Sequence, residues 1–409
     1  MTIRSRIASV ALLVVSTYLT LLVAELVVER IDHPDHFDRI RARATSAGRP
    51  FDSRPQRQVV QDLRASGVDA YPFFNAKDIG LAMRLLGQAD TVLVPISGLG
   101  GVTTVNCNES GRWATYVSDR HGFNNPDSVW TVSADAVILG DSFVMGQCVN
   151  QGQDIASRLR QRGMGVVNLG YAGNGPALVL ATLREYARPL RPRIVIWTVF
   201  DNDLADVIGE RTVPSVVRYR SGETAGWFQR ADERNALLRG LLAPVVNGRI
   251  VLWKRSWRAG VRQAVTLGAL RARVRDLRSA KMDDLAEGRR DLEAMLDEAT
   301  DETASWGGRL VLLHLPSWEF VRGNPSATEL IAAGLAQVAR RNGLLYLDGR
   351  RLFRTSTGWR YFPQDSLVST HYSAAGYDAV AQLVFEALGT AGGATTGVGR
   401  PTADPAEGR

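Results

Sequence analysis

Gly140-Asp141-Ser142 follows directly on the apolar run 136–139, and Ser142 is the first candidate for chemistry in this chain. A short run of Val, Ile and Leu that is closed by glycine is typical of a buried strand. In an open α/β sheet, ligands bind beyond the carboxyl ends of the strands. The pattern therefore places the Ser142 hydroxyl where it could attack a substrate. Taken alone, the tripeptide is equally typical of a strand-to-helix turn that Asp141 or Ser142 caps.

Acyl transfer through a serine also needs hydrogen-bond donors for the oxyanion that develops on the substrate. Two further predicted strands, 166–169 and 194–200, end in suitable groups. Gly173 lies in the glycine-rich turn after the first strand and can offer an unobstructed backbone N–H. Asn202 follows the second strand and can donate from its side-chain amide. With the backbone N–H of Ser142, these groups predict an oxyanion site at one edge of the sheet.

A general base is the remaining requirement, and His371 is the best placed of the five histidines. It lies in a polar loop just before the last helical pattern, 372–388, where a side chain can reach the ends of the strands. His314 lies inside an apolar run, which is typical of a core histidine. By residue type alone, His371 is also typical of a helix start in a polar loop.

These segments stand in the order of the four sequence blocks of the SGNH, or GDSL-like, hydrolases, and the chain resembles that family over about 135–205 and 361–388. The resemblance implies Ser142 as nucleophile and His371 as general base. It also implies an oxyanion site that is built by Ser142, Gly173 and Asn202. We further expect Asp141 and Asn174, which adjoin these positions, to contact the substrate.

Two positions depart from the family pattern. The family usually carries Asp three residues before the histidine, where this chain has Val368. Asp365, six residues before His371, is one candidate for the missing acid, and a Ser–His dyad oriented by a backbone carbonyl is the alternative. The residue before Asn202 is usually Gly and here is Asp201, whose carboxylate could oppose negative charge in the oxyanion site.

The elements that must position these residues alternate between strands and helices. Strands are predicted at 136–139, 166–169, 194–200, 310–315 and 344–347, with helices between them. This alternation predicts βαβ units around a parallel sheet. The resemblance makes this an α/β, flavodoxin-like three-layer sandwich with strand order 2-1-3-4-5. A hairpin is predicted before it, with strands at 102–108 and 112–117.

We expect the hydrolase-like domain to span 101–389, with a helical insertion at 205–305. The insertion carries Trp253 and Trp257 at helical spacing among basic residues. Such a stripe is typical of amphipathic helices that pack on the core. It is also compatible with a face that lies on a membrane or holds an anionic glycan.

The chain ends differ from this core in composition. Arg4 and Arg6 precede the uncharged run 7–24, which predicts an uncleaved transmembrane anchor within 1–30 and a remainder outside the cytoplasm. A cleaved signal peptide is the alternative. We expect 31–100 to be a stalk or irregular segment and 390–409 to be a disordered tail.

Cys107 and Cys148 are the chain's two cysteines. In an exported protein they are candidates for one disulfide, and two buried free thiols are the alternative. The disulfide would tie the segment before the core to the turn that follows Ser142.

The sequence thus predicts a serine esterase or O-acyltransferase in the bacterial inner membrane, with its catalytic domain in the periplasm. From the family context we expect O-acetyl groups of an envelope polysaccharide as substrate and polysaccharide-assembly proteins as possible partners. No metal, cofactor or nucleic-acid partner is implied, although the net charge of +7 would permit an anionic partner. The alternatives are a non-catalytic glycan-binding component, which the absence of Asp at position 368 favours, and a lipid-directed esterase.

Overall fold

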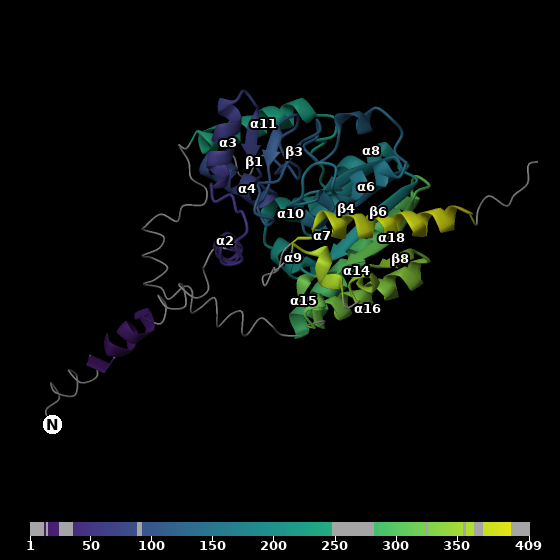
Figure 1. The fold of residues 1–409 in the computed structure, drawn as a ribbon. Helices are drawn as coiled ribbons and strands as arrows, with labels where there is room; N and C mark the ends of the chain where they lie inside the picture. Colours follow the sequence, from purple (N-terminus) through teal and green to yellow (C-terminus); the bar gives the residue numbers. More distant parts are fainter. Residues whose placement is uncertain are drawn as a thin grey trace, which may run out of the picture.

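The structure is a computed structural model that describes residues 12, 13, 15–23, 36–87, 92–247, 282–323, 326–354, 357–363 and 371–393 (Figure 1). Its centre is a five-stranded parallel sheet with strand order β5-β4-β6-β7-β8. This order confirms the predicted 2-1-3-4-5 topology. The strands are β4 (Ala136–Gly140), β5 (Val166–Gly170), β6 (Ile194–Phe200), β7 (Arg309–Leu315) and β8 (Leu345–Asp348).

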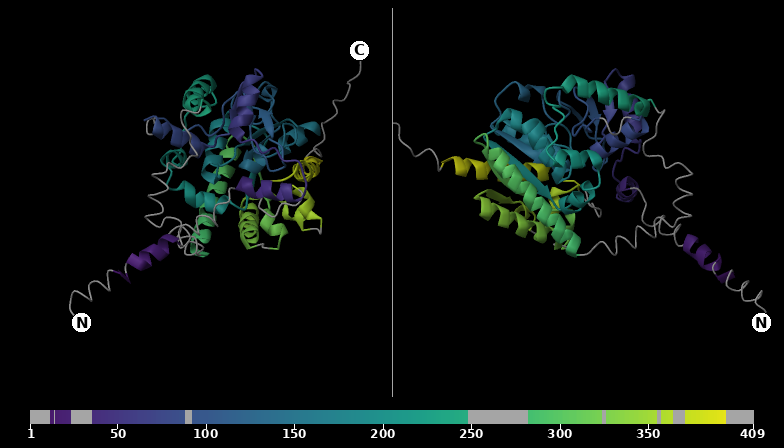
Figure 2. Two further views of the ribbon diagram at one scale, coloured as in Figure 1. Left: turned by 60° about the vertical axis from the view of Figure 1, so that its left-hand side comes forward. Right: turned by 180° about the vertical axis from the view of Figure 1, so that it is seen from behind.

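Both faces of the sheet are covered by helices, which explains why its strands are apolar at nearly every position. Alternate residues of β4 point to opposite faces: Val137 and Leu139 join one core cluster, and Ala136 and Ile138 join the other. The helices of the first face are α7 (Pro176–Thr182), α14 (Met282–Ala304) and α16 (Ser326–Asn342), and those of the second are α6 (Ile155–Gln161) and α18 (Ala374–Gly393). Figure 2 shows α14 crossing the sheet when the molecule is seen from behind. The three layers confirm the predicted sandwich.

A smaller sheet precedes the large one and combines β1 (Ala70–Pro72), β2 (Thr103–Val105) and β3 (Thr115–Val117). β2 and β3 are antiparallel, which confirms the predicted hairpin, and β1 adds to it in parallel. The helices α3 (Gln56–Ala65) and α4 (Ala76–Leu85) pack around this sheet.

The prediction that 31–100 is a stalk or irregular segment is wrong for residues 56–87 and 92–99, which join the core. Val60, Ile79, Met83 and Ile96 are buried and belong to the same core cluster as one face of the large sheet. These apolar residues are spread over several short elements, so no single window of the sequence shows a long periodic pattern. The smaller sheet and its helices therefore extend the core on that side. The preceding helix is α2 (His36–Ser46).

The described part of the insertion between β6 and β7 consists mainly of helices, as predicted. Its helices are α9 (Asp203–Glu210), α10 (Pro214–Arg220), α11 (Ala231–Val246) and the long α14. Arg234 of α11 is fully buried and donates hydrogen bonds to the Ser97 and Tyr186 hydroxyls, so α11 is joined to the core next to the small sheet. The stripe that contains Trp253 and Trp257 lies outside the described residues.

The remaining short helices are α5 (Ser142–Met145), α8 (Arg188–Leu190), α15 (Trp318–Val321) and α17 (Arg350–Phe353), with the single turns η1 (Asp127–Trp130), η2 (Leu183–Ala187) and η3 (Gly358–Tyr361).

Most of the anchor expected within 1–30 lies outside the described residues, as does the tail from 394 onward. Residues 390–393, which were expected to be disordered, continue α18. Among the residues that the structure describes, no helix combines the length and the apolar character needed to cross a membrane.

Candidate active site

Ser142 is presented by a tight turn between β4 and α5. A Cβ atom at Gly140 would lie 2.6 Å from the Val144 side chain, so only glycine allows the strand to turn so closely into the helix. The Asp141 carboxylate accepts the backbone N–H of Phe143 at 2.9 Å and caps α5. Ser142 thus becomes the first residue of the helix, half-buried at the carboxyl edge of the sheet.

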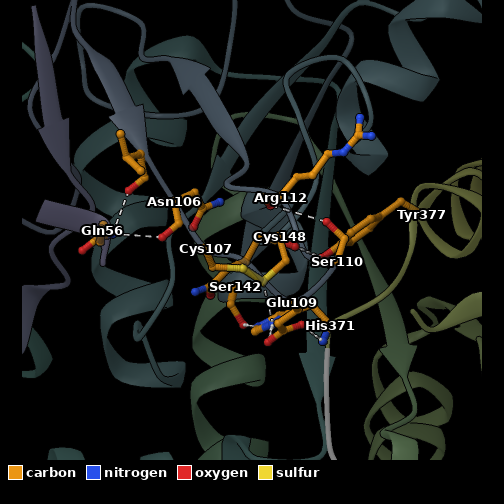
Figure 3. The surroundings of a disulfide bond; sticks show 12 residues. Gln56, Asn106, Cys107, Glu109, Ser110, Arg112, Ser142, Cys148, His371 and Tyr377 are labelled. Atoms are coloured by element: carbon orange, nitrogen blue, oxygen red, sulfur yellow. Dashed lines mark hydrogen bonds and ion pairs between the residues drawn. A yellow bond between two sulfur atoms is a disulfide. The ribbon is translucent and has the colours of Figure 1, made fainter. Parts of the chain in front are cut away.

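His371 reaches this edge from the start of α18 and contacts Ser142 directly (Figure 3). Its Nε2 lies 2.9 Å from the Ser142 Oγ. Its Nδ1 lies 3.0 Å from one carboxylate oxygen of Glu109, and its backbone N–H donates to the other at 2.7 Å. Because an ionised carboxylate only accepts hydrogen bonds, Nδ1 carries the proton and Nε2 is left to accept from the serine hydroxyl. The arrangement can therefore withdraw the Ser142 proton as the oxygen attacks an acyl carbon.

Glu109 is a site residue that the sequence reasoning missed. It lies in the loop between β2 and β3, so the carboxylate comes from the small sheet while Ser142 and His371 belong to the large one. Asp365, the acid considered from sequence, lies outside the described residues. A signal for Glu109 was present, since it stands two residues after Cys107 and the predicted disulfide brings that segment to the turn after Ser142.

The disulfide between Cys107 and Cys148 is present, with the two Cα atoms 5.0 Å apart. It lies against the imidazole of His371, because the Cys148 sulfur is 3.4 Å from Nδ1 (Figure 3). Figure 3 shows the disulfide, Glu109, His371 and Ser142 as one contiguous group. The structure thus contains the predicted disulfide, which lies next to the side chain of His371.

The electrostatics of the site favour a protonated imidazole. Burial lowers the pKa of His371, but the charge and hydrogen bond of Glu109 and the charge of Asp141 raise it by more. The net result is a pKa above the ordinary value of 6.5. Burial raises the pKa of Asp141, and the charge of Asp206 adds to this effect. Burial and the charge of Asp141 raise the pKa of a second buried carboxylate, Asp203.

This shift predicts the pH dependence of turnover. Since only the neutral imidazole can accept the Ser142 proton, we expect kcat/KM for p-nitrophenyl acetate to rise with pH and to reach half of its plateau above pH 6.5. Glu109→Gln removes the charge that raises the pKa, so the midpoint should move to lower pH. The plateau of kcat/KM should fall roughly 10³- to 10⁴-fold, because the amide no longer fixes the productive tautomer of His371.

Glu109→Asp is the matched control variant and should recover part of the plateau value of kcat/KM. A profile that is the same in wild type and Glu109→Gln would contradict this role.

The predicted oxyanion donors lie at the carboxyl edge of the large sheet but differ in how they are held. Within the described residues, the backbone N–H groups of Ser142 and Gly173 have no acceptor. Gly173 has a φ of 84° and packs against Asn75, the N-cap residue of α4, where a Cβ would meet the Asn75 Cβ at 3.0 Å. The Asn202 amide donates one hydrogen to the Asp206 carboxylate at 2.9 Å, so its second hydrogen is the one that an oxyanion could use.

The structure does not support the substrate-binding roles predicted for Asp141 and Asn174. The Asp141 carboxylate is buried and holds the turn at Ser142, including a 3.4 Å contact with the Ser142 hydroxyl. Asn174 is only 1% exposed and donates to the carbonyl of Ile96. Both residues adjoin site positions in sequence, but their side chains point into the protein and fix the backbone around the site.

Asp201 does not place its charge against the oxyanion site, contrary to the expectation from its position. Its carboxylate accepts hydrogen bonds from the backbone N–H of Ser317, the hydroxyl of Thr328 and Nε2 of His314. Burial raises the pKa of Asp201, but these hydrogen bonds lower it by more, so its charge is satisfied inside the protein. His314 is fully buried, which confirms the prediction of a core histidine.

At the carboxyl edge of the five-stranded parallel sheet, a serine contacts a histidine and the histidine contacts a carboxylate. This arrangement defines a serine hydrolase. The chain belongs to the GDSL-like lipase/acylhydrolase family, whose model matches residues 138–379. This match contains Ser142 and His371, whereas Glu109 lies before its first residue.

Among solved structures, the chain is similar to a putative lipolytic protein of the G-D-S-L family from Desulfitobacterium hafniense (12% identity, 62% of this chain and 98% of that one, TM-score 0.37). It is also similar to a lipase/acylhydrolase from Enterococcus faecalis (12% identity, 63% and 96%, TM-score 0.35). A third similar structure is the acetyl xylan esterase AlAXEase (11% identity, 62% and 98%, TM-score 0.35). The search of curated proteins found no match.

Proposed function

We propose that this acylhydrolase is a membrane-anchored esterase or O-acyltransferase that removes or transfers O-acetyl groups of a cell-envelope polysaccharide. The single observation that carries the chemistry is the chain of contacts from Ser142 through His371 to Glu109, at 2.9 Å and 3.0 Å. This arrangement suits acyl transfer through a covalent serine ester.

In the proposed reaction, Ser142 Oγ attacks the acetyl carbonyl carbon while its proton passes to Nε2 of His371. The oxyanion accepts hydrogen bonds from the backbone N–H groups of Ser142 and Gly173 and from the Asn202 amide. The tetrahedral intermediate then expels the sugar oxygen, which takes the proton from Nε2, and leaves an acetyl-Ser142 ester. Water or a second sugar hydroxyl attacks this ester and gives its proton to Nε2. Nε2 then returns the proton to Ser142 Oγ as acetate or the acetylated sugar leaves.

The alternative, a glycan-binding protein without catalytic activity, loses its main support because Glu109 provides a carboxylate for His371. That alternative rested on Val368 at the usual position of the acid. In the proposed mechanism Glu109 supplies the carboxylate from the other side of the imidazole and stabilises the imidazolium that forms during attack.

The proposed location rests on the N-terminal segment and on the disulfide. The described part of that segment is helical, and Leu12 and Val23 are 71% and 61% exposed. Exposed apolar side chains such as these would gain by burial in lipid, which supports an anchor. The disulfide supports placing the catalytic domain in an oxidising compartment such as the periplasm.

The proposed glycan substrate is supported by an exposed tryptophan in η3, a turn that is hydrogen-bonded to the segment after His371. Trp359 of η3 is 45% exposed, and the guanidinium of Arg360 lies over its ring, 5.5 Å from the centroid. η3 is attached to the start of α18, because the backbone N–H of Ser373 donates to the Tyr361 carbonyl at 2.8 Å. A flat aromatic surface at this position could pack against the apolar face of a sugar ring.

Trp359→Ala tests this placement. We expect it to raise KM for an acetylated oligosaccharide roughly tenfold, since about 1.5 kcal/mol of aromatic contact is lost. KM for p-nitrophenyl acetate, which has no sugar ring, should rise far less. Val132→Ala is the matched control, because Val132 is also an exposed apolar side chain but lies in another part of the fold. An equal effect of Trp359→Ala on both substrates would remove Trp359 from the glycan site.

The acceptor is tested by incubating the enzyme with an acetylated oligosaccharide in the presence of an isotope-labelled, unacetylated one. Hydrolysis releases acetate into solution, whereas transfer places acetyl groups on the labelled sugar, and mass spectrometry distinguishes the two. If neither product forms while p-nitrophenyl acetate is turned over, the polysaccharide substrate is wrong and the esterase chemistry stands.

A further inference from the structure

The disulfide joins the two segments that carry Glu109 and Ser142. Cys107 precedes Glu109 by two residues in the loop between β2 and β3, and Cys148 follows the α5 helix that begins at Ser142. Figure 3 shows the bond next to the contact between Glu109 and His371. The covalent tie is therefore next to the carboxylate that orients the imidazole.

Further contacts join the same two segments at the base of the loop. The Gln151 side chain pairs with the backbone of Val117, and the backbone N–H of Gln151 donates to the Thr115 carbonyl. These hydrogen bonds are at exposed positions and adjoin β3, several residues from the tip of the loop. They hold the base of the loop in place. At its tip, the Asn108 side chain donates to the Asp52 carbonyl, and the Gly111 carbonyl accepts from the Asp52 N–H. The disulfide adds the covalent tie that joins this tip to the segment of Ser142.

The Cys148 sulfur also competes for the same imidazole nitrogen. It lies 3.4 Å from Nδ1 of His371, which donates to the Glu109 carboxylate. As part of a disulfide, this sulfur has no proton to donate. As a thiol, it could donate to Nδ1 and would favour the tautomer with the proton on Nε2. That tautomer cannot accept the Ser142 proton.

We propose that Cys107 and Cys148 are positioning residues, whose disulfide keeps Glu109 on His371 and makes turnover depend on the redox state of this bond. The inference rests on the proposed esterase function. Reduction by a dithiol breaks the S–S bond and transfers two electrons and two protons to the two sulfurs. The dithiol reductant becomes a cyclic disulfide in the same step. The tip of the loop is then held only by non-covalent contacts.

The test compares oxidised and reduced protein in two backgrounds, wild type and Glu109→Gln. We expect reduction to lower kcat of the wild type for p-nitrophenyl acetate by roughly tenfold to a hundredfold, with KM nearly unchanged, because a small displacement of an orienting group has effects of this size. In Glu109→Gln, reduction should change kcat less than about twofold, because the carboxylate that the disulfide positions is already absent. An equal loss in both backgrounds, or full activity of wild type with two titratable thiols, would overturn the inference.

Cys107→Ser is the genetic counterpart of reduction. It is preferable to a change at Cys148, because Cys148 has a φ of 69° and its sulfur touches His371. Far-UV circular dichroism and thermal unfolding report whether the variant and the reduced protein remain folded. EDTA is present throughout, because ligand atoms of Cys107, Glu109 and Cys148 lie within 4.8 Å of one another and two free thiols there could bind a metal ion.

A second readout does not depend on turnover. We expect reduction to lower the pKa of His371, as measured by nitrogen NMR of the imidazole, because the nearby carboxylate is no longer held against Nδ1. If the oxidised protein shows no esterase activity but this pKa still falls on reduction, the proposed function fails and the positioning role stands. If activity is present and neither the pKa nor kcat responds to reduction, the positioning role fails and the proposed function stands.

Discussion

Ser142→Ala is expected to lower kcat for p-nitrophenyl acetate on the order of 10⁶-fold. The substitution removes the oxygen that bonds to the acyl carbon, so no acyl-enzyme can form and only water attack assisted by the oxyanion donors remains. The fold should be unaffected, because the hydroxyl contacts only Nε2 of His371 and the carboxylate of Asp141 among the described residues. Stopped-assay kinetics and thermal unfolding of the purified variant measure both effects.

Ser128→Ala is the matched control for this experiment, because it removes the same atom from an exposed position in η1. It should keep the activity of the wild type. Residual activity of Ser142→Ala within about tenfold of the wild type would show that another group is the nucleophile, and the assignment of the site would then be wrong.

His371→Ala should be nearly as damaging, with a loss on the order of 10⁵- to 10⁶-fold in kcat. Without Nε2 the serine hydroxyl keeps its proton at neutral pH, and a protonated alcohol is a poor nucleophile. Because Ser142 and His371 act as one unit, the double variant should be no slower than either single variant. Measured losses that multiply in the double variant would indicate two independent contributions and would contradict a shared proton transfer.

The central sheet could be predicted from the sequence because its strands are buried on both faces. Runs such as 194–200, where Thr198 is the one polar residue, are almost entirely apolar and are separated by helical patterns, so the strands can be located from local residues. The small sheet could not be predicted as completely. β1 has three residues, and its parallel partner β2 lies more than thirty residues further along the chain, so its pairing depends on contacts that no local pattern reports.

Within the site, the residues that follow the ends of the large sheet's strands could be predicted from the sequence. Glu109, which lies in the loop between β2 and β3, could not. Ser142 and His371 meet at 2.9 Å as predicted. The acid was sought within a few residues of His371, because the resemblance points there, whereas Glu109 is 262 residues away in sequence. Only the predicted disulfide linked that loop to Ser142, and a cysteine pair does not reveal which neighbouring side chain it presents.

Asp141 and Asn174 show the opposite error, in which residues were predicted to bind substrate but are buried in the protein. Both are polar and adjoin the site in sequence, which made them candidates for binding substrate. Whether a polar side chain faces a cleft or the interior depends on what covers it, and Asn174 is covered by the segment that contains Ile96. That segment was assigned to an irregular stalk, so the burial of Asn174 could not be foreseen.

The most direct test of the central claim is covalent labelling of Ser142 by a fluorophosphonate. In this reaction the serine oxygen displaces fluoride from phosphorus and leaves a stable adduct. Intact-mass and peptide mass spectrometry should show one adduct per chain, on the peptide that contains Ser142. The adduct should be absent in Ser142→Ala and should form far more slowly in His371→Ala. A folded wild-type protein that remains unlabelled, or a Ser142→Ala variant that is labelled at the wild-type rate, would contradict the account.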